Sequence, residues 1–197
     1  MEALKNNAKI DIAKETSELI SKYLERFPDE KSSVEKLQIQ ISTGSDIASR
    51  KNYDGHLTAT AVIINSNREI LLINHNALHK WLFPGGHYDE NEHIWNTSMR
   101  EATEETGIND LEFHEWHVKN GMIPMNVNTH PIPENRGKKE LAHQHHDFNY
   151  VLVSKSDATS IAYDEVSAAK WFGAEQVSEV AVHLDFEIKK LIRERIL

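Results

Sequence analysis

The chain has 197 residues, 39% of them apolar and 27% charged, which suits a soluble globular protein with one main domain. The formal net charge of −9 disfavours non-specific binding of nucleic acid. The absence of cysteine excludes a disulfide scaffold, a thiolate zinc site, an iron–sulfur cluster and a cysteine nucleophile. Without a long apolar run or a signal-peptide pattern, we expect a cytoplasmic protein that does not span a membrane.

Two helices are predicted in the first fifty residues. Apolar side chains recur at helical spacing over residues 10–27. A second helix is expected over residues 34–41, with Ser32 or Ser33 as its cap. We therefore expect an N-terminal helical extension over residues 1–50. It would cover a sheet, form a dimer interface or cap a substrate cleft, and a structural role is favoured.

The remainder, residues 51–197, is predicted to be one domain of interleaved strands and helices. Strands are expected in β-branched or apolar runs, at residues 57–64, 69–73, 81–83, 111–119, 148–154 and 170–172. Helices are expected at residues 94–106, closed by Gly107, and at residues 178–197. The first two strands form a hairpin, and residues 126–146 are a long polar segment. This order favours an α/β or α+β layer fold.

Three glutamates share one face of the helix expected over residues 94–106. Glu101, Glu104 and Glu105 stand at positions i, i+3 and i+4, where like charges repel and destabilise a helix. The repulsion points to an external cation, since Mg²⁺ and Mn²⁺ prefer oxygen ligands and are often held by carboxylates together with substrate phosphates. A solvated acidic face is the alternative for these glutamates considered alone.

The residues around these glutamates resemble the box of the Nudix hydrolases. The matching positions are Gly86, Glu92, Arg100, Glu101, Ala102, Glu104, Glu105, Gly107 and Ile108. The resemblance implies a three-layer α/β/α sandwich around a mixed sheet. It implies that Glu101, Glu104, Glu105 and the Gly86 carbonyl bind Mg²⁺ or Mn²⁺. It also implies that Arg100 orients a box glutamate and that Glu92 supports the junction of loop and helix.

The same resemblance implies a pyrophosphohydrolase. Metal-activated water would attack a phosphoanhydride in a small phosphate-containing substrate. We favour a nucleoside diphosphate linked to another moiety, while nucleoside triphosphates, dinucleoside polyphosphates and NADH stay open. The alternative is a non-catalytic nucleotide sensor on the same fold, and the intact glutamates count against it. An isoprenoid-diphosphate isomerase is disfavoured because that chemistry uses cysteine. If the chain self-associates, a homodimer is the commonest assembly.

A general base is expected outside the box. Glu165, six residues before Trp171, resembles a family position for a further metal ligand or base. Family members vary in where this residue lies. Glu134, Glu140 and Asp147 are therefore alternatives.

Histidines are unevenly placed. Six of the twelve fall within residues 114–146. In a strand, His143 and His145 would share one face, and the next histidine would take the other. We predict that His87, His143 and His145 contact the substrate, together with Arg136, whose guanidinium suits a phosphate. An additional transition metal or a structural role are the alternatives for the histidines.

Overall fold

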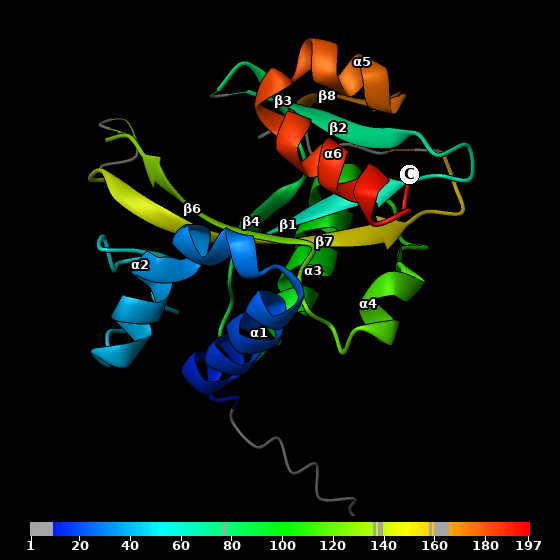
Figure 1. Cartoon of the computed structure of the whole chain (residues 1–197). Helices are drawn as coiled ribbons and strands as arrows, with labels where there is room; N and C mark the ends of the chain where they lie inside the picture. Colours follow the sequence, from blue (N-terminus) through cyan, green and yellow to red (C-terminus); the bar gives the residue numbers. More distant parts are fainter. Residues whose placement is uncertain (1–9, 77, 136, 138–139, 158, 160–165) are drawn as a thin grey trace, which may run out of the picture.

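A mixed sheet lies between two layers of helices (Figure 1). The computed structural model describes residues 10–76, 78–135, 137, 140–157, 159 and 166–197. Its helices are α1 (Ile12–Arg26), α2 (Lys31–Ser42), α3 (Ile94–Thr106), α4 (Glu115–Lys119), α5 (Ala174–Val180) and α6 (Asp185–Arg193). This arrangement confirms the predicted α/β class with helices at the N-terminus. Within the described residues, no helix is both long and apolar enough to cross a bilayer.

The eight strands form one sheet centred on β1 and β7. The strands are β1 (His56–Ile64), β2 (Ile70–His75), β3 (Lys80–Leu82), β4 (Gly85–His87), β5 (Glu112–Phe113), β6 (Asn126–Ile132), β7 (His143–Val153) and β8 (Val166–Phe172). β1 runs parallel to β7 and antiparallel to β2 and β4. β6 lies antiparallel to β7. The predicted hairpin of the first two strands is therefore confirmed, and β7 joins residues distant in sequence to β1.

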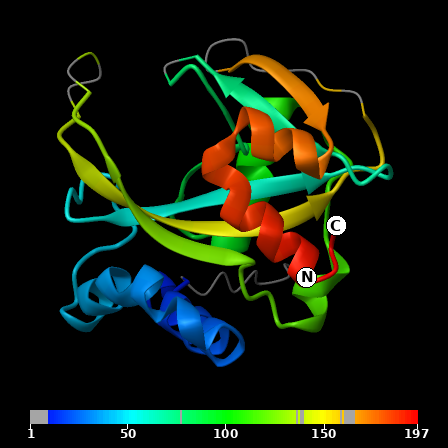
Figure 2. The same ribbon diagram turned by 45° about the horizontal axis from the view of Figure 1, so that its top comes forward.

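The N-terminal helices pack onto the main core. Leu19, Ile20 and Tyr23 of α1 are buried in the same hydrophobic cluster as Phe148 of β7. Figure 2 shows α1 and α2 beneath the sheet, with α6 crossing its other face. Of the roles expected for the extension, this packing matches the covering of a sheet. Its division from the main domain at residue 50 stays a prediction.

The second helix begins earlier than predicted, and its expected cap is wrong. A 3₁₀ turn over Pro28–Glu30 leads directly into Lys31, the first residue of α2. Ser33 therefore lies inside the helix, where its hydroxyl donates a 2.8 Å hydrogen bond to the carbonyl of Glu30. The proline at the start of the turn explains the early beginning, because its fixed φ angle suits the first turn of a helix.

The box helix α3 has the predicted bounds. Gly107 follows it with a φ of 69°, and its N–H donates to the carbonyl of Thr103 at 2.9 Å. Glycine adopts this left-handed conformation without steric cost. Ala102 packs against Ala61 and Ile63 of β1, so the face opposite the acidic residues is buried on the sheet.

Two segments in the middle of the chain differ from expectation. The strand expected over residues 111–119 is wrong, because β5 is only two residues long and α4 follows it. At the start of α4 the ring of His114 accepts the N–H of Trp116 at 3.2 Å, which caps the helix. The long polar segment over residues 126–146 is not a loop throughout. It contains β6 and the first residues of β7, whose backbone groups pair with each other despite their polar side chains.

Three further boundaries are corrected. Residues 85–87 form the additional strand β4, and β8 begins at Val166 rather than at residue 170. The helix expected over residues 178–197 is wrong as a single element. Ala181, with φ −141° and ψ 59°, separates α5 from the 3₁₀ turn and α6 that follow. These dihedral angles lie outside the helical region, so the chain changes direction at Ala181. The apolar pattern that predicted one helix therefore runs through both α5 and α6.

Candidate active site

Gly86 and Glu101 are in direct contact. A Cβ atom built on Gly86 would lie 2.4 Å from the carboxyl carbon of Glu101. The missing side chain therefore leaves the space that the carboxylate occupies. Burial raises the pKa of Glu101 above its usual value, and the neighbouring Arg100 guanidinium offsets only part of this effect. The box glycine and this glutamate thus lie next to each other in the candidate site.

Arg100 holds the loop before α3 to the helix itself. One guanidinium nitrogen donates to Glu101 Oε1 at 2.7 Å. The other donates to the backbone carbonyl of His87 at 2.9 Å and to Glu92 Oε1 at 3.1 Å. Glu92 also accepts the hydroxyl of Thr97 at 2.7 Å. Such charge-assisted bonds restrict the orientation of the groups that they join. Arg100 therefore fixes both the carboxylate of Glu101 and the end of β4 at His87.

The three box glutamates have different environments. Glu105 is buried and accepts the backbone N–H of Gly85 at 2.9 Å. The side chain of Glu104 is 58% exposed, with its nearer oxygen 3.4 Å from Arg100. Carboxylate oxygens suit a hard divalent cation, so the donor set fits Mg²⁺ or Mn²⁺. In the described part of the chain their oxygens do not converge within 4.8 Å, and Glu104 has the most freedom to approach a cation.

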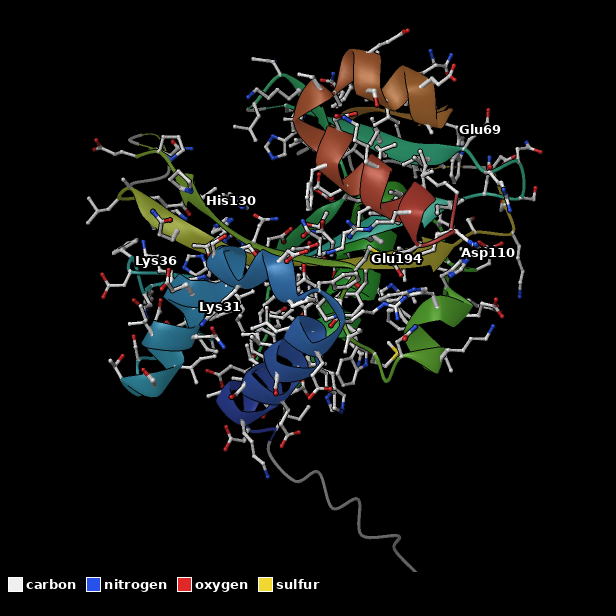
Figure 3. The ribbon with its side chains drawn as sticks, viewed as in Figure 1. Lys31, Lys36, Glu69, Asp110, His130 and Glu194 are labelled. Carbon is white, nitrogen blue, oxygen red and sulfur yellow. The ribbon has the colours of Figure 1, made fainter. Side chains whose placement is uncertain are left out.

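On the face of β4 that is opposite to Glu101, five histidines gather at one end of the sheet. They are His56 of β1, His87 of β4, His130 of β6, and His143 and His145 of β7. The His56 ring centroid lies 5.2, 5.0 and 4.9 Å from those of His87, His143 and His145 respectively. The side chain of His130, labelled in Figure 3, has its ring 5.7 Å from that of His145.

The alternation of β7 is as predicted. His143 and His145 face this cluster, whereas His146 points to the opposite face, where Nε2 lies 3.0 Å from Gln40 Oε1. Burial, together with the adjacent histidines, lowers the pKa of His145 to about 2. His145 is therefore a neutral imidazole at physiological pH.

Sequence reasoning missed His56. In-register pairing of β1 with β7 places His56 beside His145, although the two are far apart in the chain. The available signal was the alternation of polar side chains at His56, Thr58 and Thr60 within an otherwise apolar strand. In a half-polar strand such alternation marks one face, but it does not reveal which distant strand supplies the neighbours.

A row of hydrogen-bonded polar residues continues the histidine face. The carboxylate of Asp147 accepts the hydroxyls of Thr58 and Thr60 at 2.9 and 2.8 Å and the amide of Asn149 at 2.6 Å. Its acceptor positions are thus engaged within the sheet. At the far end of the row, Glu187 of α6 accepts the Asn126 amide at 3.0 Å, and burial raises the pKa of Glu187.

Several predicted site residues lie neither with the box glutamates nor with the five clustered histidines. Arg136 and Glu165 lie outside the described residues. Glu134 is exposed, and the backbone of Glu140 pairs with that of Asn135. A cavity of about 430 Å³ lies elsewhere, between α2 and the β6–β7 pair, where His143 is part of its wall. None of the box glutamates lines this cavity.

The comparisons with known proteins agree with this architecture. The family model described as NUDIX domain matches residues 54–194. The chain belongs to the Nudix family. A curated relative named probable DHNTP pyrophosphohydrolase, from Lactococcus lactis subsp. cremoris, is 30% identical over 126 residues, which are 64% of this chain and 70% of the relative. With that relative, the family match makes the chain a Nudix pyrophosphohydrolase, as the sequence predicted.

A second curated relative and a solved structure also match the chain. The m7GpppN-mRNA hydrolase NUDT17 of Danio rerio is 28% identical over 160 residues, covering 75% of this chain but only 50% of that protein. The chain therefore spans about half the length of this relative. The crystal structure of a C. elegans Ap4A hydrolase binary complex has a TM-score of 0.55 at 21% identity, covering 71% of this chain and 97% of that one. At this identity the structural match establishes the fold alone.

Proposed function

We propose that the protein hydrolyses a phosphoanhydride bond in a nucleoside diphosphate linked to another moiety, with Mg²⁺ or Mn²⁺ held by the box. The observation that carries the proposal is the Arg100 network, which connects Glu101, Glu92 and the His87 carbonyl. On a purely solvated acidic helix face, a half-buried glutamate in contact with a glycine would not be needed. The network therefore supports a preorganised carboxylate site.

Glu101, Glu104, Glu105 and the carbonyl of Gly86 would hold the cation. When bound, a divalent cation supplies a Lewis acid that acidifies water and neutralises phosphoryl charge. In the overall reaction the water oxygen bonds to one phosphorus, the bridging P–O bond breaks, and both products end as phosphomonoesters. Arg100 keeps Glu101 oriented, and the N–H of Gly85 keeps Glu105 oriented.

The general base and the substrate contacts stay proposals. Glu165 remains the proposed base. Among its alternatives, Asp147 is the least suited, because its carboxylate already accepts three side-chain donors in the sheet. His87 and Arg136 remain proposed substrate contacts. The two curated relatives carry the names of a pyrophosphohydrolase and an mRNA hydrolase, so they support the reaction class and not one substrate. A cytoplasmic location and a homodimer also stay predictions.

A substrate panel tests the proposal. Nucleotide sugars, nucleoside triphosphates, dinucleoside polyphosphates and NADH would be incubated with Mg²⁺ or Mn²⁺, and phosphate measured with and without added phosphatase. We expect phosphate from a nucleotide-linked substrate only when phosphatase is present. Glu104→Gln and Glu105→Gln should each lose about 100-fold or more of the activity, whereas Glu25→Gln, at an exposed position on α1, should keep it.

Two results would contradict the proposal. Full turnover by the Glu104→Gln and Glu105→Gln variants would remove the box from catalysis. Tight binding of a nucleotide by the folded protein, with metal present and no hydrolysis of any panel member, would favour the nucleotide sensor instead.

A further inference from the structure

The two ring nitrogens of His56 have different surroundings, and one of them is buried without a partner among the described residues. Its Nδ1 lies 3.0 Å from the backbone carbonyl of Asn52. A carbonyl only accepts hydrogen bonds, so Nδ1 must carry the proton, and Nε2 of the neutral ring keeps its lone pair. Among the described residues, this Nε2 is buried and has no hydrogen-bond partner. A buried lone pair without a donor is costly and calls for a ligand.

His143 repeats the same arrangement from the neighbouring strand. Its Nδ1 lies 2.7 Å from the carbonyl of Leu141, so this ring also donates through Nδ1 and presents the lone pair of Nε2. That Nε2 lies 3.1 Å from Nε2 of His145. Metal-binding histidines commonly donate their second ring nitrogen to a backbone carbonyl, which fixes the tautomer and the ring orientation. The rings of His56 and His143 both have this support from a backbone carbonyl.

We propose that His56, His143 and His145 bind a zinc ion. One ring nitrogen from each lies within 4.8 Å of those of the other two. Tetrahedral zinc with Zn–N distances of about 2.0–2.1 Å needs its ligand nitrogens roughly 3.4 Å apart. The pair from His143 and His145 is already near that spacing, so binding needs only a small approach by His56. Three neutral imidazoles suit zinc, and the fourth position would take water or a substrate atom.

This site is separate from the carboxylate site of the box. Gly86 faces Glu101 on the α3 side of β4, whereas the ring of His87, the next residue, packs against His56 and His145 on the other side. The alternation of a strand requires this division. Nitrogen and oxygen donors also select different metals, so zinc and Mg²⁺ would occupy opposite faces. The proposal of a zinc site does not depend on the proposed hydrolysis.

A bound zinc would connect two distant parts of the chain. β1 supplies His56, and β7 supplies His143 and His145, and these strands pair in parallel. Because zinc would bind the folded site and not the separated strands, it should raise the thermal stability of the protein.

Zinc binding to the 197-residue chain, first stripped of metal with a chelator, tests the proposal. Isothermal titration with zinc in a large excess of Mg²⁺ should give one ion per chain with a Kd of about 1 μM or tighter. Zinc should raise the melting temperature of the same sample. His56→Asn, His143→Asn and His145→Asn should each weaken binding at least ~10-fold. His79→Asn is the matched control, since His79 is exposed with a φ of 51° that asparagine tolerates, and it should bind like the wild type.

X-ray absorption at the zinc edge gives a test that needs no variant. We expect imidazole scattering and Zn–N distances of about 2.0–2.1 Å from the wild-type complex. Absence of zinc binding in excess Mg²⁺ would overturn the proposal. So would zinc binding that is lost in Glu104→Gln and Glu105→Gln but unchanged in the three histidine variants, because the ion would then lie in the box.

Discussion

Glu15 of α1 accepts the backbone N–H of Ile94, the first residue of α3, at 3.2 Å. The same carboxylate is hydrogen-bonded to the ring of His93, the residue before the helix. His93 provides no side-chain cap of its own, so the N-terminus of α3 takes its acceptor from another helix. The N-terminal helices therefore fix the start of the helix that carries the box glutamates.

Removal of this carboxylate should destabilise the protein. We expect Glu15→Ala to lower the free energy of unfolding by about 1–2 kcal/mol, because a helix N-terminus loses both an acceptor and a negative charge. Urea denaturation measures the change. Glu18→Ala is the control, since Glu18 lies on the same helix with a side chain that is 61% exposed and should matter little. Equal midpoints for Glu15→Ala and the wild type would show that the cap contributes nothing.

A methyl group at Gly86 should remove activity and spare the fold. In Gly86→Ala the new Cβ would displace the Glu101 carboxylate, whose atoms lie 2.4–2.6 Å from its position. A flexible side chain can move away, so folding should survive while hydrolysis falls at least ~10-fold. Circular dichroism and the phosphate assay check the two parts. Gly173→Ala, which meets nothing closer than 3.7 Å, should retain activity. An active Gly86→Ala would mean that the position of Glu101 is unimportant.

His117 should make the fold sensitive to acid. Its Nδ1 donates to the Ile123 carbonyl, and its Nε2 accepts the N–H of Val151, both at 2.8 Å. Burial lowers the pKa of His117 to about 4 from an ordinary 6.5. Between these values the unfolded chain binds the extra proton, so stability rises with pH across this window and is lost as pH falls from 6.5 towards 4. The loss attributable to His117 is roughly 3 kcal/mol at pH 4.

The variant His117→Gln separates this effect from other titrations. It should be less stable than the wild type near pH 7.5, because the buried hydrogen bonds are disturbed, but its stability should fall less between pH 6.5 and 4. Urea midpoints at several pH values provide the measurement, and His79→Asn should keep the wild-type slope. An unchanged slope in His117→Gln would assign the acid sensitivity to other groups.

Lys190 anchors α6 through a buried charge. Its Nζ lies 2.6 Å from Glu30 Oε2, 2.9 Å from the hydroxyl of Tyr23 and 3.7 Å from the ring centroid of Phe27. Lys190→Met keeps the apolar stem but leaves the half-buried Glu30 without this cation, which should cost about 3 kcal/mol. Calorimetry or urea denaturation measures the loss. Lys189→Met, at an exposed neighbour on the same helix, should be nearly neutral, and similar losses in both would show that the buried charge is unimportant.

Local patterns predicted the box helix well. Its apolar face, its acidic face and the glycine after it all lie within one stretch of sequence, so the bounds of α3 could be derived without knowing its neighbours. α4 could not be derived in this way. Its five residues show no helical period that differs clearly from a strand, and the cap that begins it is a histidine ring rather than a usual capping residue.

The rest of the fold and of the site depends on pairing between distant strands, which limited what the sequence alone could predict. β6 consists mostly of polar residues, and it becomes a strand because β7 satisfies its backbone groups. The same dependence hid His56, whose relation to His145 arises only from the parallel register of β1 and β7. Residues 143 and 145 were predicted to share a face because alternation along one strand is local, whereas the choice of neighbouring strand is not.

The parallel pairing of β1 with β7 also has a consequence for the order of synthesis. The bonded partners Thr58 and Asp147 are 89 residues apart, and α3 lies between them in the chain. A growing polypeptide thus releases the whole glutamate helix before the central strand of its sheet has been translated. Closing so long a loop is entropically unfavourable until the strand arrives, which makes assembly a late event. A chain stalled before residue 143 would carry every box residue and still lack β7, the strand that pairs along the whole of β1.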